Sequence, residues 1–483
     1  MKNRKHETGN WKLVNFPVFH FRFPVSGFPL VSLWFLPCAL LFSAQLAFAA
    51  GPPVERRTLP NGALLLVSEQ HALPMVVVQM IVDAGARRDP SGKEGLASLT
   101  GDLLTEGTKT RTASQISDAT DFIGAALSTG ADTDYASLGI TAVSKDLDTA
   151  LSLLTDVLLH PTFPEAEVAR RREAALASMQ ASEDDPGSVA QRTFVQTLFH
   201  NEPYGHPAIG TPAAVRKLTR ADLVDFYQRY YHPAGSIIAV VGDVTTADVE
   251  ARMQAALRDW NGAAAPAFEY GPSAPADAVA VLVDKPVSQA NLILGQRGVA
   301  RDNPDYLTLT VMNFILGGGG FTSRLLDNIR TKSGLAYSVG SGFSVNKSPG
   351  SFQVVMQTKN QSANDAIQRT CGEIERIRRE PVTDEELSGA KLYLTGSFPM
   401  RFDTNAKIAG FLSQVVFYNL GDDYADTYAA RINAVTKEDI QRVAQQYLHP
   451  EQLDLVAVAK LDQAGIAAAA PCRAAAAPAA NGE

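Results

Sequence analysis

Two stretches of this sequence share one pattern of residues, half a chain apart. The stretch LTRADLVDFYQRYYHP covers 218–233, the stretch VTKEDIQRVAQQYLHP covers 435–450, and 217 residues separate the histidines of the two. Each stretch leads into a short apolar run, at 236–243 and at 454–460. Amphipathic helices can look alike by chance, but chance would not also repeat the element that follows. We therefore expect two copies of one domain.

Periodicity along the chain assigns elements to both copies. Apolar runs predict strands, at 59–69, 75–84, 134–143 and 236–243 in the first copy and at 278–284, 290–298, 351–359 and 454–460 in the second. Helical spacing predicts helices, at 95–106, 113–125, 145–161, 164–182, 187–199, 219–231 and 245–259 in the first copy and at 303–316, 321–332, 361–379, 383–399, 403–419 and 435–447 in the second. The predicted fold class is α+β: two duplicated domains, each a mixed and mainly antiparallel sheet packed with helices.

Composition suggests where the copies begin and end. Residues 261–277 are rich in Ala, Pro and Gly, which is typical of a linker between domains at 50–260 and 278–462. The Ala/Pro-rich tail at 463–483 is predicted to be disordered. The formal net charge of −8 argues against a nucleic-acid partner, because phosphate binding needs clustered cations.

Residues 1–49 are predicted to be a secretory signal peptide. A basic segment precedes an apolar run at 28–41, and Ala47-Phe48-Ala49 forms a small-x-small cleavage pattern before Ala50. An uncleaved membrane anchor is the alternative, but the apolar run is short and contains two prolines. We expect a secreted protein without a stable membrane span after cleavage, periplasmic if the source is a Gram-negative bacterium.

The chain has three cysteines, Cys38, Cys371 and Cys472. Cys38 lies in the predicted signal peptide, and the spacing of the other two matches neither a metal site nor a disulfide framework. An oxidising compartment would allow the two to pair, but Cys472 lies in the tail predicted to be disordered. We expect them to remain unpaired.

The stretch GLASLTGDLLTEGT at 95–108 is predicted to form a helix with two faces. Its leucines make one apolar stripe, while Ser98, Gly101 and Asp102 fall at i, i+3 and i+4 and share the other face. An inverted zinc motif, H-x-x-E-H, would place its ligands and its base on such a face. The second face is therefore a candidate site whose residues are not those of a zinc peptidase.

The frame of this helix, GLA followed by LL and GT, is similar to the active-site helix of the pitrilysin/insulinase family of zinc peptidases. Ser98 and Asp102 stand at the positions that match the two histidines, and Gly101 stands at the position of the glutamate. The resemblance also places the third ligand, a glutamate in the family, at Gln180 within a helical stretch at 163–186. It thus implies the family scaffold without catalytic zinc residues, and no cofactor in this chain.

A glycine-rich loop opens the stretch LGGGGFTSRLLDNIRTKSGLAYSVGS at 316–341. Its glycines are Gly317, Gly318, Gly319 and Gly320. A phosphate-binding loop is the obvious alternative, but no G-K-[ST] or strand–GxGxxG context is present. The stretch is very similar to the second-domain signature of the pitrilysin family, which implies that the glycine loop, Arg330 and Tyr337 contact substrate. Without that resemblance, Arg330 reads as a surface helix residue and Tyr337 as a half-buried strand residue.

Together these features favour a zinc-less subunit of a secreted, heteromeric peptidase of this family. The resemblance implies a heterodimer in which a zinc-bearing paralogue hydrolyses a peptide or unfolded polypeptide, the two chains closing like a clamshell around it. Arg330 and Tyr337 would hydrogen-bond the peptide carbonyl or the oxyanion that forms from it. Two alternatives remain open: a non-catalytic peptide-binding or assembly protein, similar to core subunits of the respiratory cytochrome complex, and a stand-alone metallopeptidase with atypical ligands.

Overall fold

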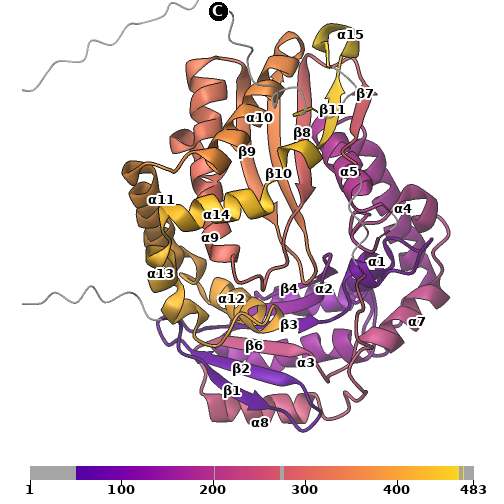
Figure 1. The fold of residues 1–483 in the computed structure, drawn as a ribbon. Coiled ribbons are helices and arrows are strands. Elements are labelled where there is room, and N and C mark those ends of the chain that lie inside the picture. The colour runs from indigo at the N-terminus through magenta and orange to yellow at the C-terminus, as the bar shows by residue number, and fades with distance from the viewer. Residues whose placement is uncertain (1–50, 201, 272–276, 467–470, 473–483) are drawn as a thin grey trace, which may run out of the picture. The chain divides into compact units, whose positions relative to one another are not determined.

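The computed structural model describes residues 51–200, 202–271, 277–466 and 471–472. The predicted signal peptide and most of the predicted tail lie outside these residues, as does part of the predicted linker. Two sheets, each with helices packed against it, make up the described part of the chain (Figure 1).

The first sheet has six strands, and only one of its pairs is parallel. Strand β2 runs parallel to β6, and all the other neighbours are antiparallel. The order across the sheet is β1 (Glu55–Thr58), β2 (Leu64–Glu69), β6 (Ile237–Gly242), β3 (Met75–Val82), β5 (Ala136–Val143) and β4 (Ala126–Ala131).

The second sheet has five strands that repeat the last five of the first sheet. Their order is β7 (Ala280–Asp284), β11 (Asp454–Ala459), β8 (Gln289–Arg297), β10 (Ser351–Lys359) and β9 (Ala336–Ser344). Strands β7 and β11 form its parallel pair, just as β2 and β6 do in the first sheet. The predicted fold class, a duplicated α+β fold with mixed sheets, is confirmed.

Strands β4 and β9 were not predicted from the sequence. Each lies at one edge of its sheet. Their sequences, ALSTGA and AYSVGSGFS, consist mostly of small residues. Such residues give neither a continuous apolar run nor a clear alternation, so the usual strand signal is absent. Both strands exist because a neighbouring strand, β5 or β10, supplies their hydrogen bonds.

Helices of the first half form where capping residues and apolar stripes predict them. Thr112 and Thr219 each begin a helix with a capping box, in which the side chain accepts a backbone N–H and the third helical residue bonds back. The helices are α1 (Leu96–Asp102), α2 (Ala113–Phe122), α3 (Leu147–Leu159), α4 (Glu165–Ser182), α5 (Pro186–Leu198), α6 (Pro212–Val215), α7 (Arg220–Tyr230) and α8 (Thr246–Ala256), with short 3₁₀ turns at Ala86–Arg88 (η1) and Ser144–Asp146.

The second half follows the same order with one irregularity around its glycines. Helix α9 widens into a π-helix, η3, before the glycine loop, and a second π-helix, η5, stands where the sequence predicted one regular helix at 321–332. The helices are α9 (Tyr306–Asn313), η3 (Phe314–Gly318), η5 (Leu326–Lys332), α10 (Ala363–Arg379), α11 (Asp384–Ser397), α12 (Asn405–Phe417), α13 (Tyr424–Ala434), α14 (Lys437–Tyr447) and α15 (Leu461–Ala464), with 3₁₀ turns at Gly320–Thr322 (η4), Asn360–Ser362, Phe398–Arg401 and Pro450–Gln452.

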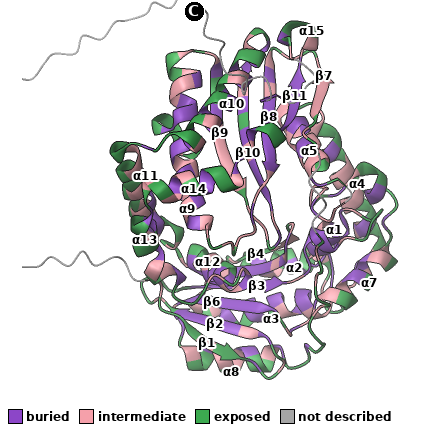
Figure 2. Cartoon of the chain, viewed as in Figure 1, coloured by how far each residue is buried: buried purple, intermediate pink, exposed green. Residues whose placement is uncertain are grey.

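Each half gives one helix to the other half's sheet. Helix α12 of the second half buries Ile408, Leu412 and Phe417 against β2, β3 and β6. Helix α5 of the first half buries Val189 and Phe194 against β8 and β11. The central strands are therefore buried on both faces (Figure 2). This reciprocal packing joins the halves by apolar burial, which was not predicted from the sequence.

A buried carboxylate adds polar contacts between the halves. Asp134, in the turn between β4 and β5, is almost fully buried. It accepts hydrogen bonds from the hydroxyls of Tyr204 and Tyr418, at 2.8 and 3.1 Å, and from the backbone N–H of Lys347 at 2.8 Å. Its Oδ1 also lies 3.4 Å from Nε of buried Arg87. Because Lys347 and Tyr418 belong to the second half, this carboxylate ties the end of β4 to that half.

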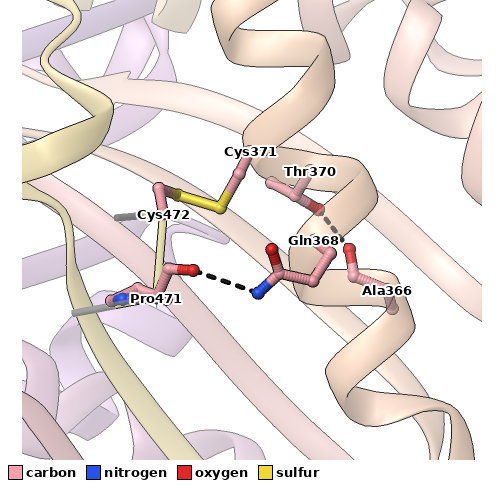
Figure 3. The surroundings of a disulfide bond; sticks show 6 residues. All are labelled: Ala366, Gln368, Thr370, Cys371, Pro471 and Cys472. Carbon is pink, nitrogen blue, oxygen red and sulfur yellow. Dashed lines mark hydrogen bonds between the residues drawn. A yellow bond between two sulfur atoms is a disulfide. The ribbon is translucent and has the colours of Figure 1, made fainter. Parts of the chain in front are cut away.

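Cys371 and Cys472 form a disulfide, so the prediction that they remain unpaired is wrong (Figure 3). Cys371 is buried on α10, and Cys472 is buried against it. Gln368 of the same helix donates a hydrogen bond to the carbonyl of Pro471 at 3.1 Å. Composition made this end of the chain look unstructured, but Pro471 and Cys472 find partners on α10, which only the fold brings near.

Candidate functional site

The start of α1 is held by a half-buried aspartate, Asp89. Gly95 and Ala97 donate their backbone N–H groups to the carboxylate of Asp89, at 2.7 and 2.8 Å. Gly95 has a φ of 101° and lies so close to the carbonyl of Ile209 that an added Cβ would be 2.5 Å from its oxygen. Burial raises the pKa of Asp89 to about 7, although the backbone bonds act in the opposite direction. The helix is thus fixed by contacts that leave little freedom to shift.

Gly101 packs directly against the backbone of edge strand β4. A Cβ added at Gly101 would lie 2.6 Å from the carbonyl carbon of Gly130 and 2.9 Å from the nitrogen of Ala131. No real Cβ makes contacts this short, and a strand backbone cannot swing aside as a flexible side chain can. The glutamate that would serve as the base of a zinc peptidase therefore has no room at position 101.

Asp102 is half-buried beside the same strand. Burial is the main reason that its pKa is raised; the charge of nearby Arg171 opposes this, and that of Glu106 adds to it. Glu106 is buried and bonded to Arg171, and it also accepts from Arg170 at 2.7 Å. The carboxylate nearest Asp102 is thus already neutralised by two guanidinium groups and is not available as a metal ligand.

Gln180 lies exposed on α4, and Ser98 is half-buried on α1. The donors at the four positions matching the family's zinc site are therefore a hydroxyl, one carboxylate and an amide, with none from Gly101. Catalytic zinc is held by His, Cys or carboxylate ligands and needs a nearby base. Within the described residues no group of three or more His, Cys, Asp or Glu side chains is placed to hold a metal. The residues present do not fit a catalytic zinc.

The glycine loop of the second half serves close packing at two positions. A Cβ at Gly317 would lie 2.4 Å from Oγ of Ser341 in β9, and one at Gly319 would lie 2.6 Å from the carbonyl oxygen of Phe314. Gly320 has a φ of 58°, which glycine adopts without strain. A side chain at Gly318 would meet the amide of Asn313 at 2.8 Å. These contacts explain the four glycines without a bound phosphate.

The loop and η5 bring Arg330 and Tyr337 together. The guanidinium carbon of Arg330 lies 5.9 Å from the ring centroid of Tyr337 and 5.1 Å from that of Phe321. Tyr337 is 70% exposed, so it is a strand residue, as one interpretation of the sequence held, but not a half-buried one. Neither side chain has a hydrogen bond or ion pair within the described part of the chain. Both therefore keep their hydrogen-bonding groups free.

A polar cavity lies beside β4, the edge strand of the first half. It has a volume of about 550 Å³ and is bounded by α2, the turn after α1 and the start of β4. Its walls include Thr105, Glu106, Ser114, Ser117 and Asp121. Strand β4 pairs with β5 alone in the described sheet, so an extended chain could align along its open edge and place a side chain in this cavity.

Comparison with known proteins identifies the scaffold. Residues 65–212 match the model described as insulinase (peptidase family M16), and residues 217–394 match the one described as peptidase M16 inactive domain. A crystal structure from Pseudomonas fluorescens, titled as a peptidase M16 inactive domain, is 30% identical. It covers 84% of this chain and 98% of its own, with a TM-score of 0.80. The chain belongs to the peptidase M16 family.

Other similar proteins are named as proteases. An uncharacterized zinc protease of Streptomyces coelicolor is 28% identical over 403 residues, which is 82% of this chain and 87% of that protein. A protease from Helicobacter pylori has the same fold, at 21% identity and a TM-score of 0.77, over 84% of this chain and 99% of its own. The resemblance to the pitrilysin/insulinase family drawn from the sequence is confirmed.

Two features of the site were missed by sequence reasoning. The first is Gly130, whose contact with Gly101 depends on an edge strand that was not predicted. The second is Phe321, which lies within the quoted glycine stretch and is 75% exposed. An apolar residue between the glycines and the Ser-Arg-Leu run was a signal that could have drawn attention to it.

Proposed function

We propose that this chain is the zinc-less subunit of a secreted, heteromeric M16 peptidase. A paralogue with an intact H-x-x-E-H motif would supply zinc, and this chain would supply Arg330 and Tyr337. The observation that carries the proposal is the contrast between its halves. Gly101 packs against β4 where a base would stand, whereas Tyr337 is exposed, Arg330 is half-buried beside it, and both have unused hydrogen-bonding groups.

The proposed chemistry follows from these two side chains. A guanidinium and a phenol donate hydrogen bonds to a carbonyl oxygen, and more strongly to the oxyanion that forms from it during hydrolysis. An arginine whose side chain has no hydrogen bond or ion pair within the described residues can make such bonds without first breaking others. The partner's zinc would activate water on the other side of the peptide, so that each subunit contributes one part of the reaction.

The substrate class in this proposal is an extended peptide or unfolded polypeptide. Strand β4 has one unpaired edge, and the polar cavity opens beside it. Pairing along a strand edge uses backbone groups, so it tolerates many sequences. This supports a role in holding chains of varied sequence.

Secretion is supported by two independent observations. The first 49 residues carry a signal-peptide pattern, and the described residues contain a buried disulfide between Cys371 and Cys472. Structural disulfides persist in oxidising compartments and are rare in the reducing cytosol. In addition, none of the described helices is long and apolar enough to cross a bilayer.

The deciding experiment is a pull-down of the tagged mature chain from extracts of its own source, followed by zinc and peptidase assays on the eluate. A co-purifying M16 chain with zinc and cleavage activity is the expected result. A clean, inactive and zinc-free single species would favour the non-catalytic assembly or binding protein, and stoichiometric zinc in the isolated chain would favour the stand-alone peptidase.

Arg330→Ala tests the residue within that complex. Loss of one oxyanion donor is expected to lower kcat/KM by about 100-fold. The matched control is Lys332→Ala, which removes an exposed cation from the same helix and should leave activity near that of the wild type. Full activity of Arg330→Ala would contradict the role assigned to this side chain.

A further inference from the structure

Phe321 is an exposed aromatic residue presented on an ordered turn. It is 75% exposed, although a phenylalanine side chain is usually stabilised by burial. The turn around it is fixed by hydrogen bonds: Gly319 N–H donates to the carbonyl of Phe314 at 2.8 Å, and Ser323 N–H and Oγ–H both donate to the carbonyl of Gly320, at 3.0 and 2.7 Å. The ring is therefore held in solvent by local structure.

The surroundings of Phe321 resemble part of a binding surface. The guanidinium carbon of Arg330 lies close to the ring centroids of both Phe321 and Tyr337, at 5.1 and 5.9 Å, and both rings are largely exposed while Arg330 is half-buried. Aromatic and arginine side chains that are already ordered are among the residue types that dominate binding energy, because they bury much area and lose little freedom. The arrangement thus combines two exposed rings with a donor that has no hydrogen bond or ion pair within the described residues.

We propose that Phe321 is a specificity-determining residue that selects an apolar side chain in the bound peptide. This inference rests on the proposed function, in which Arg330 holds a peptide carbonyl. A side chain next to that carbonyl would then lie against the Phe321 ring, while Tyr337 borders the guanidinium. Basic side chains would be repelled by Arg330, and small polar ones would leave the ring in water.

The test uses the mature chain, residues 50–483, and fluorescein-labelled extended peptides of alternating Ser and Thr that differ at one central position. That position is Phe, Ser or Asp. Fluorescence anisotropy gives the dissociation constant of each peptide for the wild type, Phe321→Ala, Phe321→Leu and Arg330→Ala. A matched control is Phe122→Ala, which removes another exposed ring, at the end of α2 in the first half.

The wild type is expected to bind the Phe peptide about tenfold more tightly than the Ser peptide, the discrimination that one apolar contact provides. Phe321→Ala should bring this ratio close to one without changing the affinity for the Ser peptide, Phe321→Leu should retain part of it, and Phe122→Ala should retain all of it. Arg330→Ala should weaken binding of both peptides.

The experiment distinguishes a failure of the specificity assignment from a failure of the proposed function. If Phe321→Ala keeps the preference, or if the Asp peptide binds more tightly than the Phe peptide, the specificity assignment is overturned while the clamp function stands. If Arg330→Ala binds both peptides as tightly as the wild type, or if the wild type binds none of the peptides, the proposed function itself is contradicted.

Discussion

The two halves of this molecule share one sheet order but differ at the equivalent edge strand. In the first half, α1 lies on β4 so closely that Gly101 has no space for a side chain. In the second half, the turn and π-helix beside β9 leave Phe321 and Tyr337 exposed, with Arg330 half-buried beside them. One duplicated scaffold thus gives a closed position in one copy and an open one in the other.

The difference shows that the two halves vary at the edge strand in the side chains they leave accessible. Central strands of both sheets are buried and fixed by packing on both faces, including the helix that each half lends to the other. At the edge a change among small residues decides whether a helix closes onto the strand. Residues at the edge strands can therefore differ between the two halves without altering the fold.

The largest expected effect concerns the disulfide, which only the second half has. Replacing both Cys371 and Cys472 by serine should lower the free energy of unfolding by about 4 kcal/mol, because the bond closes a loop of 101 residues in the unfolded chain. Urea denaturation, with reduced wild type as the control, measures this. Equal stability of the oxidised wild type and the double variant would show that the bond does not stabilise the second half.

The next prediction compares how a carboxylate in each half makes the stability depend on pH. Asp89 before α1 has its pKa raised to about 7 by burial, so the folded state holds a proton that the unfolded state releases near pH 4. This contribution is full below pH 4 and is lost as the pH rises through 7, by about 4 kcal/mol in total. Asp89→Asn should remove that part of the pH dependence of urea unfolding.

Asp305 in the second half provides a control, because its effect on stability depends on pH in the opposite direction. Asp305 before α9 has its pKa lowered, chiefly by hydrogen bonds from Arg442 at 2.7 and 3.0 Å, with a further bond from Tyr447. Its contribution is present above the unfolded pKa and is lost as the pH falls through the lower folded one. Asp305→Asn should therefore destabilise at neutral pH, and the same pH response from both variants would contradict this comparison.

The smallest expected effect tests the close contact between α1 and β4. Gly101→Ala should destabilise by about 2 kcal/mol, because the added carbon meets the backbone of β4. Gly389→Ala, in an exposed stretch of α11 with open space around it, should instead stabilise by about 1 kcal/mol. Thermal unfolding of the two variants gives the comparison, and a stable, zinc-free Gly101→Ala protein would mean that β4 can move away from α1.

Sequence patterns predicted most elements of the fold. The repeated stretch that contains His232 or His449 indicated the duplication, and helical spacing predicted a helix at 219–231, which α7 confirms. The edge strands β4 and β9 were missed because their small residues carry no strand signal. Helix α13 was also missed; its buried Tyr428 stacks on Phe398, a contact made across the fold.

By itself the sequence determined the duplicated α+β scaffold, the absence of histidine and glutamate at the four positions that match the zinc site by resemblance, and the presence of Arg330 and Tyr337, since these follow from periodicity and residue identity. Only the tertiary structure decided that Gly101 has no room beside Gly130, that Cys472 reaches Cys371, and that Phe321 stands beside Arg330. Each of these depends on distances between residues remote in the sequence, or on a turn whose geometry is set by packing, and local patterns carry no information about them.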